Sequence, residues 1–159
     1  MDITIRVAEH ADAQAVTRGL RRSIREICHP DHQGDEAIIG QWLANKTVAN
    51  VAQWLTSPQA LALVAVADDQ LVGIGMLSRS GEVLLCYVAP EVVGQGVGHR
   101  LLRALLHTAE EWKLEHVYAE STATARSFYL RNGFEPVSEP VVDGGIRGYP
   151  MRRRVAAGA

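Results

Sequence analysis

The sequence predicts one α/β domain in which a mixed, mostly antiparallel central sheet is flanked by helices. The chain has 159 residues, 47% of them hydrophobic, which is typical of a single globular core. Apolar runs with the alternation of strands are interspersed with apolar stripes at helical spacing. A glycine-rich turn joins an apolar strand to a helix within residues 83–102. We predict that the domain covers residues 3–155 and that residues 155–159 form a frayed tail.

The first third of the chain is predicted to contain one strand and three helices. Apolar and polar residues alternate over residues 3–7, as in an edge or half-buried strand. Apolar residues recur at helical spacing in three segments, which are residues 16–27, 38–43 and 51–55. Thr47 is placed to act as the N-cap of the third helix. The Pro, Gly and Asp content of residues 28–34 predicts a loop.

A three-stranded meander follows. Residues 61–67 and 71–77 are β-rich runs joined by a turn at residues 68–70, which predicts a hairpin. Residues 82–88 form the third strand, and their nearly unbroken apolar run predicts burial on both faces at the centre of the sheet. The period of two in a strand places Glu82 on the same face as Cys86.

The remaining elements begin at the glycine turn. Apolar residues at helical spacing predict a helix there, on a stripe formed by Leu101, Leu102, Leu105, Ala109 and Trp112. Residues 117–121 are a predicted strand and residues 123–131 a predicted helix, which Gly133 ends in the left-handed conformation. Residues 134–137 and 149–155 form a final strand pair around a loop at residues 143–145.

Composition narrows the function classes. The formal net charge is −2, which is not the electrostatic footprint of a nucleic-acid-binding protein, although residues 147–154 are locally basic. The sequence contains no apolar run long enough for a membrane span and no leader pattern at its start. Cys28 and Cys86 are too few for a disulfide framework. We expect a cytoplasmic protein without nucleic-acid or membrane partners, and the sequence leaves a homodimer open.

The glycine-rich turn predicts a site for a phosphorylated ligand. The N-terminus of a helix presents unpaired N–H groups and partial positive charge, and Gly94, Gly96 and Gly98 would let a phosphate approach the backbone closely. Two common glycine motifs do not fit. A dinucleotide fingerprint would need a third glycine where His99 or Leu101 stands, and a P-loop would need a lysine that this turn lacks.

Two segments resemble the GNAT N-acetyltransferase superfamily. Residues 93–98 are similar to its pyrophosphate loop, Arg/Gln-x-x-Gly-x-Gly/Ala, although Val93 departs from the pattern at the first position. Residues 120–134 resemble the strand, short helix and Phe-Tyr-x-x-x-Gly-Phe segment of the family, with Tyr129 at the tyrosine position. The resemblance extends roughly from Ile3 to Arg153 and implies an acetyl-CoA-dependent N-acetyltransferase.

The resemblance also implies a set of residues that bind acetyl-CoA. The strand edge around Cys86 to Val88 resembles the edge that binds the pantetheine arm and the acetyl carbonyl in this family. Thr122 stands where many relatives have an asparagine that contacts the cofactor, and its alternative role is to cap the following helix. The full predicted set is Cys86, Tyr87, Val88, Val93, Gly94, Gln95, Gly96, Val97, Gly98, His99, Thr122 and Tyr129.

Acetyl transfer to an amine needs an unprotonated amine, a stabilised oxyanion and a proton for the thiolate. The resemblance makes Tyr129 the acid that protonates the thiolate, with packing against Phe128 as the alternative. Glu82 is the predicted base, and an ordinary solvated carboxylate is the alternative. Cys86 has apolar surroundings and no adjacent histidine, which favours direct attack over an acyl-cysteine.

The loop at residues 28–34 has two interpretations. Cys28, His29, Asp31 and His32 could be metal ligands, but no second cluster at ligand spacing accompanies them, and we predict no metal. This loop, together with Asp35 and Glu36, is instead expected to form part of the acceptor mouth, where its acids would attract a cationic amine.

The sequence thus predicts transfer of an acetyl group from acetyl-CoA to a primary amine of a small molecule or peptide, by direct attack in a ternary complex. One alternative is a non-catalytic acyl-CoA-binding module or regulatory subunit with the same fold. The other, a regulatory domain that binds a different nucleotide, leaves Phe128 and Tyr129 unexplained.

Overall fold

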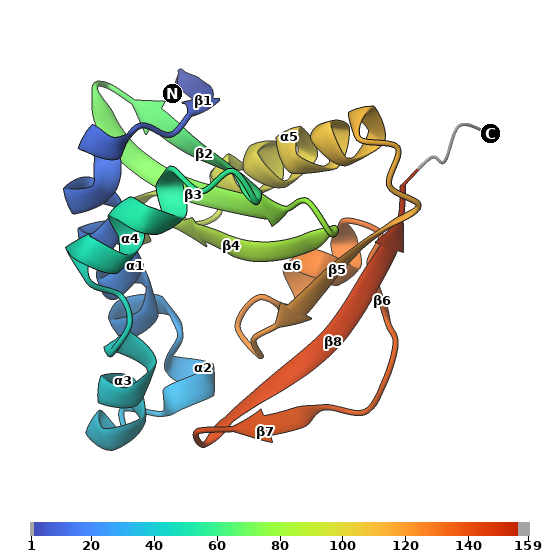
Figure 1. The fold of residues 1–159 in the computed structure, drawn as a ribbon. Coiled ribbons are helices and arrows are strands. Elements are labelled where there is room, and N and C mark those ends of the chain that lie inside the picture. The colour runs from blue at the N-terminus through green and yellow to red at the C-terminus, as the bar shows by residue number, and fades with distance from the viewer. Residues whose placement is uncertain (1, 156–159) are drawn as a thin grey trace.

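The computed structural model describes residues 2–155 (Figure 1). The predicted tail beyond Val155 lies outside the described residues. The strands are β1 (Ile3–Val7), β2 (Ala60–Ala67), β3 (Gln70–Ser78), β4 (Glu82–Val88), β5 (His116–Ser121), β6 (Glu135–Pro136), β7 (Val141–Asp143) and β8 (Ile146–Arg154). The helices are α1 (Ala13–Ile27), α2 (His29–His32), α3 (Glu36–Leu43), α4 (Val48–Leu55), α5 (Val97–Glu111) and α6 (Arg126–Arg131), with short 3-10 turns η1 (His10–Asp12) and η2 (Pro90–Val92).

The predicted fold class is confirmed. One eight-stranded sheet runs in the order β1-β2-β3-β4-β5-β8-β6, and β7 pairs with β8. Neighbouring strands are antiparallel except for β4 and β5, which are parallel and are joined by a crossover through α5. Helices α1 and α4 pack on one face of the β2–β4 region, and α5 packs on the other (Figure 1). The sheet therefore has a helical layer on each side.

The packing of α5 depends on two glycines in β3. A Cβ atom at Gly73 would lie 2.8 Å from Leu101 Cδ1, and one at Gly75 would lie 3.2 Å from Leu105 Cδ1. Their absence lets the leucine stripe of α5 approach the sheet closely. This approach fixes the helix over β3 and β4, so that its N-terminus comes to lie beside the end of β4.

The β2–β3 hairpin is confirmed, with a tight turn. Asp68 and Asp69 have φ angles of 50° and 61°, and Gln70 already belongs to β3. Positive φ at both central residues matches the right-handed twist of the flanking strands, and aspartate tolerates it better than most residues.

Strand β4 is central, as predicted, but the prediction of burial on both faces is wrong. Leu77 pairs with Val83 and Met76 pairs with Leu85, so Leu84 is an extra residue in a β-bulge. Leu84 is 45% exposed, and Glu82 is also exposed. The bulge opens one side of β4 to a cavity, which the apolar sequence alone does not reveal.

The same bulge overturns the predicted face of Glu82. Val83 and Cys86 both contact the core beneath α5, whereas Leu85 contacts the core beneath α1. Because the extra residue reverses the alternation, Glu82 and Cys86 lie on opposite faces of the strand.

Two further segments differ from the sequence-based predictions. The predicted loop at residues 28–34 contains the short helix α2, with Pro30 in its first turn, where proline is tolerated. The loop before β8 contains β7, which forms a hairpin with β8. A Cβ atom at Gly145, at the tip of this hairpin, would lie 3.0 Å from Ile38 of α3, so the hairpin reaches across to that helix (Figure 1).

The helices of the described residues do not include one with the length and apolar character needed to cross a membrane.

Candidate functional site

A cavity of about 580 Å³ lies where β4 and β5 separate. The two strands pair only at Glu82 with Tyr118 and at Val83 with Ala119. Leu84 and Glu120 are the next residues on each strand, and both line the cavity at the vertex of the opening. Beyond them the strands diverge, and β4 leads to the glycine turn at the wide end.

One edge of β4 faces this opening. The backbone N–H of Ala89 donates to Val72 O of β3 at 2.8 Å. Because successive backbone groups of a strand point to opposite edges, the N–H groups of Cys86 and Val88 point away from β3 and towards the opening. They are therefore donors available to a ligand, as the resemblance implied for this strand edge.

The glycine turn supplies further backbone donors. Gly96 is the N-cap of α5 with a φ of 85°, and the first helical hydrogen bond runs from Arg100 N to Gly96 O at 3.1 Å. The N–H groups at Val97, Gly98 and His99 have no partner within the helix. A Cβ atom at Gly94 or Gly96 would meet nothing within 4 Å, so the turn borders open space. Such an arrangement can bind phosphate oxygens, and we refer to it as the phosphate cradle.

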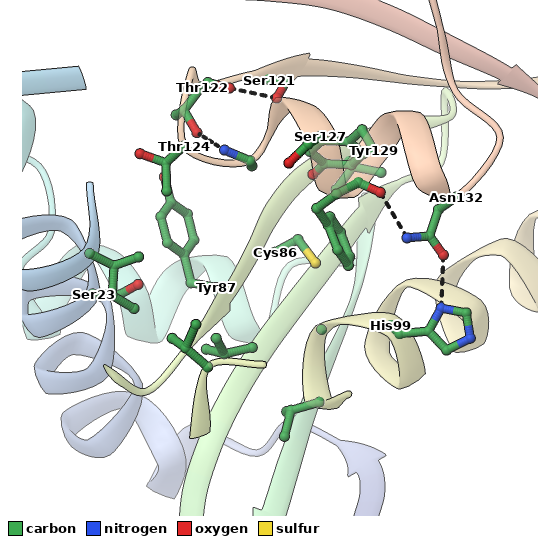
Figure 2. Close-up of a pocket in the computed structure, with 18 of the residues that line it drawn as sticks. Ser23, Cys86, Tyr87, His99, Ser121, Thr122, Thr124, Ser127, Tyr129 and Asn132 are labelled. Carbon is green, nitrogen blue, oxygen red and sulfur yellow. Dashed lines mark hydrogen bonds between the residues drawn. The ribbon is translucent and has the colours of Figure 1, made fainter. Parts of the chain in front are cut away.

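Basic side chains gather at the same end. His99 Nδ1 lies 2.8 Å from Asn132 Oδ1, and Asn132 Nδ2 donates to Phe128 O at 2.8 Å (Figure 2). Because the Asn132 amide nitrogen is the donor to Phe128, its oxygen accepts from His99 Nδ1–H, and His99 Nε2 can donate to an anion when the ring is doubly protonated. Arg131 also lines the cavity. Two basic side chains thus accompany the backbone donors.

A nearby acid is neutralised. The guanidinium of Arg22 in α1 forms two hydrogen bonds of 2.9 Å with the Glu91 carboxylate, just before the glycine turn. The Arg22 hydrogen bond lowers the pKa of Glu91 below its usual value. The ion pair with Arg22 offsets the negative charge of Glu91 near the phosphate cradle.

Tyr129 is held in place by the end of α6. Phe134 N donates to Tyr129 O at 3.0 Å and Gly133 N donates to Leu130 O at 3.2 Å, while Gly133 has a φ of 85°. These bonds form a Schellman motif, and its hydrophobic contact is the edge-to-face packing of Phe134 on Tyr129 at 5.1 Å. The predicted helix stop at Gly133 is confirmed.

The Tyr129 hydroxyl faces the cavity. Tyr129 is 6% exposed and lines the cavity, and its hydroxyl makes no hydrogen bond within residues 2–155. Every fully buried side-chain oxygen in that range has a hydrogen-bond partner, so the Tyr129 hydroxyl oxygen is not fully buried. The oxygen therefore keeps access to the cavity. Burial first, and then nearby Cys86 and Tyr87, raise the pKa of Tyr129 well above its usual value. The phenol is thus protonated at neutral pH.

The vertex of the cavity carries a carboxylate. Glu120 is exposed and shares the cavity lining with apolar residues, among them Ile27 of α1 and Leu84 of β4. In β5 the side chains of Val117, Ala119 and Ser121 are buried, and Glu120 points to the opposite face. Sequence reasoning missed this residue, although the period of two in β5 was visible.

Two predicted site residues stay outside the cavity lining. Glu82 is exposed at the start of β4, and its backbone N–H donates to Ser78 Oγ at 3.0 Å. Gln95 directs its side chain to Glu91 O at 3.2 Å. The other predicted residues line the cavity: Cys86, Tyr87, Val88, Val93, Gly94, Gly96, Val97, Gly98, His99, Thr122 and Tyr129.

Thr122 acts as a local cap. Its Oγ1 accepts a hydrogen bond from Ala125 N at 3.0 Å, as the capping alternative predicted (Figure 2). The helix itself begins only at Arg126, so Thr122 caps the turn that precedes α6.

The acids and histidines of residues 28–34 serve the fold. Asp31 accepts hydrogen bonds from Ala123 N at 2.7 Å and Thr124 N at 3.1 Å. Contrary to our expectation, this carboxylate therefore stabilises the fold and is not free to attract an amine. His32 is buried; Gly34 N donates to its Nδ1, so Nε2 carries the proton donated to Ile24 O at 2.9 Å. No group of three potential metal-ligand side chains occurs within residues 2–155.

Burial disfavours the thiolate form of both cysteines. Burial raises the pKa of Cys86 to about 12, and burial followed by the nearby Asp31 carboxylate raises the pKa of Cys28 to about 12. Neither is a thiolate at neutral pH, which disfavours an acyl-cysteine.

The sequence model described as an acetyltransferase (GNAT) domain matches residues 28–155. The chain belongs to the GNAT family. The resemblance seen in the glycine turn and in the Phe128-Tyr129 segment is thereby confirmed.

An uncharacterized N-acetyltransferase of Mycobacterium tuberculosis is 31% identical to this GNAT chain over 99 residues, and the match covers 58% of this chain and 64% of that protein. An amino-acid acetyltransferase of the same species is 33% identical over 91 residues, 52% of this chain and 51% of that protein. The chain thus spans less than two thirds of the length of these relatives.

Solved structures share the fold of this GNAT chain. A GCN5-related N-acetyltransferase from Rhodopseudomonas palustris has a TM-score of 0.86 at 22% identity, covering 97% of this chain and 96% of that chain. The PaiA N-acetyltransferase from Thermoplasma acidophilum, in complex with coenzyme A, has a TM-score of 0.80 at 22% identity, covering 97% and 99%.

Proposed function

We propose that the chain transfers the acetyl group of acetyl-CoA to a primary amine of a small molecule or peptide by direct attack in a ternary complex. The observation that carries this proposal is the distribution of charge along one cavity. Backbone donors and the basic side chains of His99 and Arg131 lie at the wide end, and Glu120 lies at the vertex. An elongated anionic cosubstrate fits the first end and a cationic amine fits the second.

The residues at the wide end fit coenzyme A. The glycine turn and the start of α5 would hold the pyrophosphate, with Val93 contributing no side-chain donor. The N–H groups of Cys86 and Val88 would bind the pantetheine arm and polarise the thioester carbonyl. Acetyl-CoA, when bound, supplies the activated acetyl group. Family membership and the coenzyme A complex of the Thermoplasma acidophilum relative support this assignment.

Glu120 is the general base that we assign to the amine. It lines the cavity at the vertex, where its exposed carboxylate can meet a cationic amine. It would bind the ammonium group and take up its proton directly or through water. Glu82, the base predicted from the sequence, stays a prediction, and its position outside the cavity lining favours Glu120 instead.

Tyr129 is the acid that we assign to the departing thiolate. Its hydroxyl is accessible from the cavity and is protonated at neutral pH, because burial raises the pKa of Tyr129. The Schellman motif and the Phe134 ring fix the direction of this hydroxyl. After attack by the amine, collapse of the tetrahedral intermediate breaks the carbon–sulfur bond, and the phenol gives its proton to sulfur.

The test is a panel of amino acids, polyamines and short peptides with acetyl-CoA, followed by release of free thiol. We expect thiol release that depends on one class of primary amine and falls by about 10²-fold or more in Glu120→Gln. Gln33→Glu, a change of opposite sign on an exposed residue that does not line the cavity, serves as the control.

One result would contradict the proposal as a whole, and another would contradict its assignment of Glu120. Binding of coenzyme A without turnover of any amine would favour the non-catalytic acyl-CoA-binding module. Full activity of Glu120→Gln would leave transfer intact but remove Glu120 from it.

A further inference from the structure

Gly148 of β8 leaves room for the Glu120 side chain. A Cβ atom at Gly148 would lie 2.8 Å from Glu120 Cγ, 2.9 Å from Cδ and 3.0 Å from Oε1. Real carbon atoms do not approach so closely without bonding, so any residue other than glycine would displace the carboxylate arm. The contact involves nearly the whole side chain of Glu120 rather than its tip alone.

The strand register explains why this contact matters. Glu120 pairs with Pro150, so its diagonal neighbours on the same face of β8 are Gly148 and Arg152. Ser121 pairs with Tyr149, and extending the antiparallel register by one position brings Gly148 beside Thr122. Gly148 therefore lies near the end of β5 that borders the cavity. Arg152 lies in the opposite direction, beside Tyr118. The Glu120 side chain therefore leans over Gly148, towards the cavity and away from Arg152.

Arg152 makes the other direction attractive to a carboxylate. It is exposed, and its register partners are Tyr118 on β5 and Glu135 on β6. A carboxylate displaced from Gly148 would come within reach of this guanidinium, where an ion pair would retain it. The presence or absence of a side chain at residue 148 thus decides between two orientations of the Glu120 side chain.

We propose that Gly148 is a positioning residue that directs the Glu120 carboxylate into the cavity and keeps it from pairing with Arg152. This inference rests on the proposed function of Glu120. Gly148 itself touches no reacting atom. Its contribution is the missing Cβ atom, which makes the cavity-facing orientation of Glu120 sterically possible.

The substitution that tests this is Gly148→Ala. The φ angle of Gly148 lies outside the left-handed region, so alanine is compatible with its backbone, and the added methyl group acts mainly on Glu120. We expect kcat/KM for the amine to fall by about 10²-fold, as for a misplaced catalytic group, with the KM for acetyl-CoA nearly unchanged. Gly40→Ala in α3 is the matched control, because a Cβ atom there meets nothing within 4 Å.

A double-mutant cycle shows whether the effect passes through Glu120. In the Glu120→Gln background, adding Gly148→Ala should cost little further activity, because the carboxylate is already absent. An undiminished additional loss in that background would overturn the proposal, as would parental kcat/KM in Gly148→Ala alone.

A second cycle is independent of activity. Gly148→Ala should lower the melting temperature when Glu120 is present, and much less in the Glu120→Ala background, where the displaced atoms are gone. This result would support the steric relationship even if no amine were acetylated, so it separates failure of this inference from failure of the proposed function. Equal melting shifts in both backgrounds would contradict the inference.

Discussion

Asp31 of α2 is bound to Thr124, a residue of the turn before α6, through both the backbone N–H at 3.1 Å and the hydroxyl of Thr124. The same carboxylate accepts a hydrogen bond from Ala123 N at 2.7 Å. A charged acceptor thus satisfies two backbone donors that the turn itself leaves unpaired. This contact connects the helices on one side of the cavity with the segment that carries Tyr129 on the other.

Asp31→Asn should therefore affect both stability and the site. We expect the free energy of unfolding to fall by about 1 to 3 kcal/mol, because an amide is a weaker acceptor and cannot serve all the donors. Coenzyme A affinity should fall as well, since α6 loses its anchor. Urea unfolding and calorimetric titration measure the two effects. Asp35→Asn is the control, because Asp35 caps α3 by accepting from Ala37 N and Ile38 N outside the cavity. Unchanged coenzyme A affinity in Asp31→Asn would show that the anchor does not reach the site.

Gly96→Val should abolish coenzyme A binding. A Cβ atom at Gly96 projects into the open space of the cradle, and a branched side chain would occupy the place of a phosphate. Its φ of 85° also makes the substitution strained. Gly34→Val isolates that strain, because Gly34 has a φ of 77° and does not line the cavity. Thermal shift with coenzyme A should persist in Gly34→Val and vanish in Gly96→Val. Equal ligand-induced shifts in both variants would make the glycine turn purely structural.

Arg22→Ala should weaken coenzyme A binding by less than about tenfold, because it leaves the Glu91 carboxylate unpaired beside the phosphate cradle. The effect should diminish at high salt, which screens exposed charges. Arg22→Ala combined with Glu91→Ala should restore affinity. Arg25→Ala is the control, since Arg25 lies on the same helix but pairs with Glu36. Failure of the double variant to recover would mean that Arg22 contacts the ligand or stabilises the turn in another way.

Cys86→Ala should retain acetyl transfer within a few-fold, because direct attack needs no thiol nucleophile. Burial raises the pKa of Cys86 to about 12, so its thiolate fraction is small at neutral pH and grows with rising pH. Alkylation of the native protein should accordingly be slow and should speed up with rising pH. Loss of transfer in Cys86→Ala, or an acetylated Cys86 in intact-mass spectra, would indicate an acyl-cysteine.

Local chemistry accounts for the parts of the fold that the sequence predicts well. The hairpin at Asp68 and Asp69, the left-handed Gly133 and the glycine turn at Gly96 each follow from conformational preferences of a few adjacent residues. Thr47 caps α4 by accepting from Asn50 N at 3.2 Å, as predicted. These features need no information from distant parts of the chain.

The parts that were missed depend on distant contacts. Helix α2 is stabilised by the hydrogen bonds of Asp31 to residues 123 and 124, which no local pattern reveals. Nothing in the apolar run of β4 marks Leu84 as the extra residue of a bulge, and the bulge decides which side chains share a face. Glu120 becomes notable only when β4 and β5 are seen to separate just before it.

The most direct test of the account is the turnover of Tyr129→Phe on the best amine from the panel. The substitution keeps the ring that packs on Phe134 and removes only the hydroxyl that faces the cavity. Under conditions where chemistry limits turnover, the account predicts a fall in kcat of about 10²-fold with little change in acetyl-CoA affinity. Tyr118→Phe, on an exposed tyrosine outside the cavity lining, should retain parental kcat. A parental kcat in Tyr129→Phe would contradict the assignment of Tyr129 as the acid for the departing thiolate.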